Sequence, residues 1–172
     1  EIVTEAVPGI TSEQHIAMVR ALAKASGYRG MCGGQAIDLA STDKHIDLKA
    51  LTQLHNMKTG ALISCAVELA LIAANAPKDQ YQTMMEFAHA VGLAFQVQDD
   101  ILDIIATTEE LGKPQGSDAE SNKSTFPQLL GLQGAKDTAA QLIQEALSAL
   151  AKLPYNSQLI ADFARYIIER RI

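Results

Sequence analysis

Three aspartates offer the clearest chemistry in this sequence. Asp99, Asp100 and Asp103 stand close together, and the residues around them, such as Phe95 and Ile104, are mostly apolar. On a helix, residues three or four positions apart share a face, so Asp103 would lie near both other carboxylates. Carboxylates in apolar surroundings need a counter-charge, and Mg2+, which prefers oxygen ligands and is shared with substrate phosphates, is the natural one. The alternative is a solvated acidic patch.

Basic residues that could bind an anion occur at two places. Lys58 and Thr59 stand before Gly60 in an apolar stretch. They could face the aspartates and bind a diphosphate, with Gly60 letting the chain bend, or Lys58 could simply extend to the surface. Lys113 and Lys123 belong to a long polar stretch that contains several glycines. It could close over phosphates as a lid, or be a solvated loop, but its spacing is not that of a Walker P-loop.

Other polar residues carry weaker signals. Gln35 and Asp38 follow a pair of glycines and could border a site or only cap a turn. The four histidines lack the spacing of metal ligands. Cys32 and Cys65 match no zinc or redox motif, so we expect reduced core residues of a cytoplasmic protein.

Helices must position these residues, because few stretches favour strands. Hydrophobic residues make up 48% of the 172 residues and aromatics only 5%, with no clean alternation, which predicts an all-α protein. A capping box at Thr11 and Gln14 and a cap at Asp47 predict two helix starts. The expected helices cover residues 12–26, 35–39, 48–74 (bent near Gly60), 78–106, 134–153 and 156–170.

Charge and hydropathy exclude some classes of protein. The net charge of −6 argues against a general nucleic-acid binder, although a few lysines beside a metal suffice for a small anion. The most apolar stretch, residues 61–76, contains Glu68 and is short for a membrane span, so it predicts a buried helix and no membrane insertion.

Four stretches together resemble the short-chain trans-prenyl-diphosphate synthases, especially the bacterial farnesyl diphosphate synthases. They are residues 30–39 (GMCGGQAIDL), 55–62 (HNMKTGAL), 92–103 (GLAFQVQDDILD) and 111–127, which contains Leu111-Gly112-Lys113 and Asn122-Lys123-Ser124-Thr125-Phe126-Pro127. Asn122 stands where bacterial members often have glycine, and Asn tolerates the same left-handed backbone.

The resemblance implies an all-α isoprenoid-synthase bundle that condenses isopentenyl diphosphate with an allylic diphosphate. Mg2+ ions would clamp the allylic diphosphate, which ionises before attack and proton loss. The implied metal ligands are Asp99, Asp100 and Asp103, with Asp99 the strongest candidate. The implied diphosphate ligands are Lys58, Lys113 and Lys123. Thr59 and Gln96 would place polar oxygens near the developing allylic cation, Phe95 would bind the substrate, and Gln35 and Asp38 would border the metal site.

One departure from the family narrows this prediction. The first aspartate-rich motif of the family lies upstream of all four stretches, and Glu1 and Glu5 do not replace it. We therefore expect residues 1–172 to be the C-terminal part of one synthase domain, inactive alone and homodimeric when full length. The alternatives are a non-catalytic subunit that tunes a complete synthase and a terpene cyclase; the lysines and aspartates argue against the first, and the Lys58-Thr59 and Phe95-Gln96 pairs against the second.

Overall fold

The fold is helical throughout the part of the chain that is described. The computed structural model describes residues 5, 7–106 and 123–170. The helices are α1 (Ser12–Ser26), α2 (Met31–Ala40), α3 (Leu48–His55), the short π-helix η2 (Asn56–Gly60), α4 (Ala61–Ala73), α5 (Lys78–Ile105), α8 (Phe126–Leu150) and α9 (Gln158–Glu169). No strand occurs in these ranges, so the predicted all-α class is confirmed.

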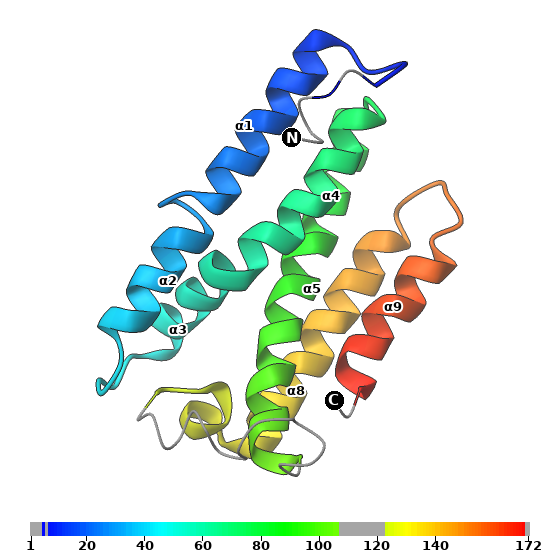
Figure 1. Ribbon diagram of the computed structural model, residues 1–172. Coiled ribbons are helices and arrows are strands. Elements are labelled where there is room, and N and C mark those ends of the chain that lie inside the picture. Colours follow the sequence, from blue (N-terminus) through cyan, green and yellow to red (C-terminus); the bar gives the residue numbers. More distant parts are fainter. Residues whose placement is uncertain (1–4, 6, 107–122, 171–172) are drawn as a thin grey trace.

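Helix α5 is the centre of the fold. Figure 1 shows it in green between the α1–α4 side and the α8–α9 pair, and it contacts α4, α8 and α9. Its apolar side chains form the core cluster with those of α8 and α9. The spacing of Ala88, Val91, Phe95, Gln98 and Leu102 predicts a buried face of this helix. Of these residues, Phe95 is only half-buried. The others are fully buried: Ala88, Val91, Gln98 and Leu102.

Side-chain caps start the helices where the sequence predicted. The Thr11 side chain accepts the backbone N–H of Gln14, whose side chain accepts the N–H of Thr11 in return, which completes the expected capping box. The Asp47 carboxylate accepts the N–H of Ala50 at 2.8 Å and begins α3. Both predicted helix starts are therefore confirmed.

Helix α8 begins earlier than the sequence predicted. A capping box formed by Thr125 and Gln128 starts it at Phe126, whereas we expected a start near Gly134. Gly131, with a φ of 74°, kinks the helix inside this first part. The Thr125 cap and the buried Phe126 begin the helix here.

The expected long helix of residues 48–74 is divided into three parts. The π-helix η2 separates α3 from α4, so the predicted bend near Gly60 is a change of helix type. A Cβ added to Gly92 of α5 would lie 3.1 Å from the Cα of Gly60, so the two glycines allow α5 and η2 to approach closely. Single π turns inside α-helices are often found at functional sites.

By length and composition alone, the stretch Leu48–Ala73 could cross a membrane, with a mean hydropathy of 1.3. The core helix of a soluble protein passes the same test. Here η2 interrupts the stretch, which contacts α1, α2 and α5. Most of α4 is half-buried, with Ser64 and Cys65 fully buried, so the helix is less enclosed than the sequence predicted.

Helix α1 presents much of its apolar face to solvent. The spacing of Ile16, Val19, Leu22 and Ala23 predicts one shared face. Ile16, Val19 and Leu22 are 60%, 41% and 36% exposed, and Ala23 is exposed too. Helix α1 contacts α4 instead through two small residues, Ala21 and Ala25, and through the Gln14 side chain, which donates to the carbonyls of Ile72 and Ala73. The periodicity therefore predicted the helix correctly, but that face is not covered by the described residues.

The two cysteines occupy different environments. Cys65 is buried in the contact between α1 and α4, as expected of a core residue. Cys32 is exposed, so its predicted burial is wrong. The reason is that α2 turns the side carrying Gly34 toward η2, which leaves Cys32 on another face. Both thiols are free.

Candidate active site

One end of the candidate site consists of Asp38, Lys58 and Lys123, which we call the lysine end. Lys58 Nζ donates to Asp38 Oδ2 at 2.6 Å, and Lys123 Nζ lies 3.2 Å from each oxygen of that carboxylate. Burial alone would raise the pKa of Asp38, but the hydrogen bonds and charges of both lysines outweigh it and hold the pKa below its ordinary 3.8. The ionised carboxylate therefore holds two cations side by side, and about a third of each lysine side chain stays open to solvent (34% and 31%).

Close contact between α2 and η2 positions this end. A Cβ on Gly34 would lie 2.3 Å from the backbone N of Lys58, so only glycine permits the two segments to approach this far. Asp38 stands four residues after Gly34 and therefore on the same face of α2. The glycine thus brings the backbone of η2 to the carboxylate that its lysine must reach.

The other end consists of Gln96, Asp99 and Arg170, which we call the aspartate end. Gln96 Nε2 donates to Asp99 Oδ2 at 2.9 Å, and the Arg170 guanidinium forms an ion pair with Asp99 Oδ1. The guanidinium also lies over the Phe95 ring, 4.5 Å from its centroid, and the Arg170 carbonyl accepts a hydrogen bond from Gln98. The Asp99 side chain remains 40% exposed.

One stripe of α5 connects the two ends. Gly92, Gln96 and Asp99 are spaced four and three residues apart, so they lie on one face of the helix. Gly92 packs directly on Gly60 of η2, which follows Lys58 and Thr59 in the same short π-helix. The face of α5 that packs on η2 is therefore the face that carries Gln96 and Asp99.

The other two aspartates point into the protein. Asp100 is 7% exposed and Asp103 is 2% exposed. Asp100 Oδ2 accepts the backbone N–H of Phe126 at 2.9 Å and lies 3.4 Å from His55 Nε2. Of the predicted metal ligands, only Asp99 is partly open to solvent.

Asp99 suits a magnesium ion by its chemistry. Among the residues that are described, no group of three or more acidic, histidine or cysteine side chains is arranged to hold a metal ion. Mg2+, however, commonly uses only one or two carboxylates and completes its shell with water and substrate phosphate. Asp99, a partly exposed carboxylate, can serve as one such ligand. The predicted set of three carboxylates stays a prediction.

The remaining predicted site residues are less closely gathered. Thr59 is half-buried in η2 next to Lys58, and Gln35 is exposed on α2. Lys113 lies outside the described residues. Sequence reasoning missed Arg170 and His55, because neither belongs to a pattern of charge or metal spacing. His55 could have been noticed, since it stands three residues before Lys58 within a stretch that carries the family resemblance.

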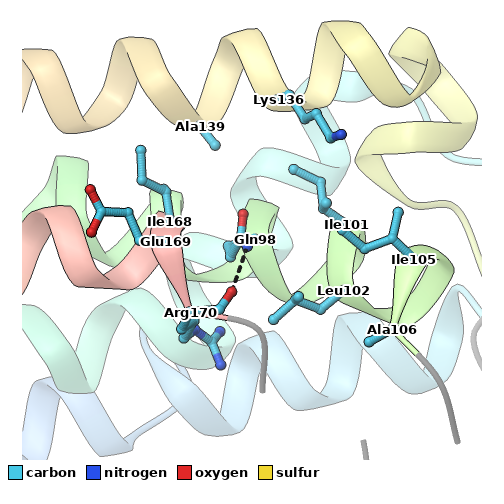
Figure 2. A pocket seen from close by; sticks show the side chains of 10 residues that line it. All are labelled: Gln98, Ile101, Leu102, Ile105, Ala106, Lys136, Ala139, Ile168, Glu169 and Arg170. Atoms are coloured by element: carbon cyan, nitrogen blue, oxygen red, sulfur yellow. Dashed lines mark hydrogen bonds between the residues drawn. The ribbon is translucent and has the colours of Figure 1, made fainter. Parts of the chain in front are cut away.

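A cavity of about 500 Å³ adjoins the aspartate end (Figure 2). It lies between α5, α8 and the end of α9, and Arg170 is the residue that it shares with the aspartate end. Its wall is mainly apolar, with Ile101 of α5 and Ile168 of α9, and Lys136 contributes from α8. None of its lining residues is a predicted metal or diphosphate ligand.

Comparison with known proteins identifies the family of the chain. The profile described as polyprenyl synthetase matches residues 2–160. The chain is 46% identical to a farnesyl diphosphate synthase of Haemophilus influenzae, over 99% of this chain and 58% of that protein. It is 45% identical to the farnesyl diphosphate synthase of Escherichia coli, over 95% of this chain and 56% of that protein.

Two solved structures have the same fold. A geranylgeranyl pyrophosphate synthetase from Pyrococcus horikoshii has a TM-score of 0.85 at 25% identity, over 98% of this chain and 62% of that one. A geranyltransferase from Helicobacter pylori, complexed with magnesium and isoprenyl diphosphate, has a TM-score of 0.80 at 31% identity, over 98% of this chain and 55% of that one.

These matches define the class first: an all-α fold shared with prenyl-diphosphate synthases. The chain belongs to the polyprenyl synthetase family, and the resemblance predicted from its four stretches is confirmed. It spans a little over half the length of the curated relatives given above.

Proposed function

We propose that this chain carries the diphosphate-binding part of a prenyltransferase that condenses isopentenyl diphosphate with dimethylallyl or geranyl diphosphate to a farnesyl-type product. The observation that carries the proposal is the lysine end, where one carboxylate holds Lys58 and Lys123 together with their outer faces open to solvent. Two adjacent ammonium groups suit a diphosphate, which presents several oxygens close together.

The chain's other residues suit the rest of this chemistry. Breaking the carbon–oxygen bond requires the departing diphosphate to be stabilised, which Lys58 and Lys123 would do, with Lys113 as a third ligand. Thr59 and Gln96 would direct oxygen atoms toward the allylic cation, and Phe95 would contact the substrate. The apolar helices around them would keep water from the cation.

Magnesium would support the leaving group from the aspartate end. Asp99 would hold the ion, which supplies positive charge to neutralise the diphosphate oxygens as the bond breaks. The Helicobacter pylori neighbour, whose structure contains magnesium and isoprenyl diphosphate, supports this proposal. The Arg170 guanidinium now pairs with Asp99, so metal binding requires that pair to open.

We also propose a cytoplasmic protein, homodimeric when full length, that neither inserts into membranes nor binds nucleic acid. The net charge of −6 and the two free thiols support this. The alternative of a non-catalytic partner subunit gains no support from the described residues, because a purely structural subunit does not need a preformed pair of lysines.

Pyrophosphate binding tests the proposal directly. Titration of the 172-residue chain with inorganic pyrophosphate in magnesium buffer should give saturable binding, and Lys58→Ala should weaken it by about tenfold or more, because a hydrogen bond to a charged group is lost. Lys152→Ala is the matched control, since this exposed lysine pairs only with Glu86 on the described surface and should leave the affinity unchanged. Equal affinity of wild type and Lys58→Ala would contradict the proposal.

The expectation that these 172 residues alone have no synthase activity stays a prediction. The purified chain should form no product from geranyl diphosphate and isopentenyl diphosphate while still binding pyrophosphate. Product formation would show that the aspartate end described here suffices for the reaction.

A further inference from the structure

A buried junction of His55, Asp100 and Phe126 joins α3, α5 and α8. Asp100 Oδ2, on α5, accepts the N–H of Phe126 at 2.9 Å and lies 3.4 Å from His55 Nε2 at the end of α3. The His55 and Phe126 rings stack with their centroids 5.8 Å apart and an angle of 17° between the planes. All three residues are at most 8% exposed, so no water competes freely for these contacts.

Each partner of Asp100 adjoins a segment that carries a diphosphate lysine. His55 immediately precedes η2, which contains Lys58. Phe126 is the first residue of α8 and follows Lys123 by three positions. Asp100 contacts the buried His55 ring and the backbone N–H of Phe126. These contacts therefore fix the end of α3, just before η2, and the start of α8, just after Lys123.

The surroundings of Asp100 differ from those of a metal ligand. The Asp100 side chain is 9% exposed, compared with 40% for Asp99, and its Oδ2 already serves two partners. The N–H of Phe126 stands at the start of α8, where the helix dipole favours a negative charge. The buried carboxylate therefore has partners within the protein and does not need a metal to balance it.

We propose that Asp100 and His55 are positioning residues that hold Lys58 and Lys123 at the spacing a diphosphate requires, and that Asp100 is not a metal ligand. This inference rests on the proposed function of the lysine end. Asp38 alone cannot maintain the spacing, since the flexible lysine side chains would follow any shift of η2 or of the segment before α8. The junction keeps both segments anchored to α5, which also carries Asp99.

The test combines two measurements on the 172-residue chain: hydrogen exchange at the Phe126 amide, and the affinity for inorganic pyrophosphate with magnesium. Asp100→Ala should accelerate the exchange at least tenfold and weaken pyrophosphate binding about tenfold, because the acceptor is lost. Asp100→Asn keeps an acceptor oxygen and should stay within about threefold of wild type in both measurements. Asp99→Asn should weaken pyrophosphate binding about tenfold and leave Phe126 exchange unchanged.

His55 provides a second, independent variant. His55→Leu, which removes the donor, should weaken pyrophosphate binding several-fold, and His55→Gln, which keeps an N–H donor, should recover most of the loss. Circular dichroism and thermal melting confirm that each variant is folded; should the Ala or Leu variant unfold, the comparison of Asp100→Asn with Asp99→Asn decides alone.

The outcomes separate the inference from the proposed function. If Asp100→Asn weakens binding as much as Asp99→Asn, Asp100 is a ligand and the inference is wrong. If Asp100→Ala leaves exchange and affinity unchanged while Lys58→Ala still weakens binding, the positioning role fails and the proposed function stands. If Lys58→Ala has no effect on binding either, both are overturned.

Discussion

The lysine end and the aspartate end of the site balance their charges in opposite ways. At the lysine end a buried carboxylate, Asp38, holds two partly exposed cations. At the aspartate end a mostly buried cation, Arg170, covers a partly exposed carboxylate, Asp99, with side-chain exposures of 14% and 40%. In both, the buried partner belongs to the scaffold and the exposed partner belongs to the proposed ligand site.

The difference lies in what a ligand must displace. An incoming diphosphate can approach the open faces of Lys58 and Lys123 while both remain near Asp38, so this end is organised before binding. An incoming cation must first separate Arg170 from Asp99, although the guanidinium can stay stacked on Phe95. The lysine end is thus preformed, and the aspartate end must open.

The largest change should come from filling the contact that builds the lysine end. Gly34→Ala would place a Cβ 2.3 Å from the backbone N of Lys58, and backbone cannot yield as a flexible side chain does. We expect a loss of about 3 kcal/mol in the free energy of unfolding, measured with urea, together with lost pyrophosphate binding. Metal binding at Asp99 should change far less in the fraction that stays folded.

The matched control for this substitution is Cys32→Ala, on the same helix but exposed. It should change the free energy of unfolding by less than about 0.5 kcal/mol. If Gly34→Ala proves equally mild, the close approach of α2 and η2 does not organise the lysine end.

At the aspartate end we expect a smaller effect, which is a gain in metal affinity. Arg170→Gln removes the guanidinium that a metal ion must displace from Asp99, so Mn2+ affinity should rise by about tenfold, the equivalent of one partly buried charged hydrogen bond. Electron paramagnetic resonance of free Mn2+ measures this. The control is Arg165→Gln, whose exposed pair with Asp162 lies on α9 away from the site. Unchanged or weaker Mn2+ binding in Arg170→Gln would show that the pair does not oppose the metal.

The sequence predicted the helices better than the contacts between them. Caps at Thr11 and Asp47 and the buried face of α5 could be identified locally, because capping and helical periodicity depend on near neighbours. The pairing of Lys58 with Asp38 could not, since it depends on how closely Gly34 lets α2 approach η2. The aspartates show the same limit: their spacing indicated one shared face, but packing buries Asp100 and leaves Asp99 open.

Other failures have the same origin. The expected start of the helix near Gly134 was too late, because the Thr125 cap and the buried Phe126 begin α8 at Phe126, before the kink at Gly131. Arg170 belongs to no motif, and only the path of α9 along α5 brings it to Asp99. Long-range charge pairs are set by tertiary packing, so residue types and spacing indicate the chemistry of a site before they indicate which groups are paired.

The smallest expected effect concerns how Asp38 stabilises the lysine end as the pH changes. Burial raises the pKa of Asp38, but the two lysines lower it further, so the folded-state pKa lies below the unfolded value of about 3.8. Such a group stabilises the fold above the unfolded pKa, and this stability is lost as the pH falls through the folded pKa. Asp38→Asn should therefore lower the free energy of unfolding by about 1 kcal/mol at pH 7. This value is reduced because solvent screens the charges of the part-exposed lysines.

Urea unfolding of wild type and Asp38→Asn at pH 7 and at successive values below 4 measures this dependence. The difference in the free energy of unfolding between the two proteins should decrease steadily below about pH 3.8. The reason is that the wild-type carboxylate becomes protonated and then, like the amide, carries no charge. Asp162→Asn, which removes an exposed carboxylate, should show no comparable gap at either pH. If the difference in the free energy of unfolding between wild type and Asp38→Asn persists unchanged at low pH, Asp38 stabilises the lysine end through its shape and hydrogen bonds and not through its charge.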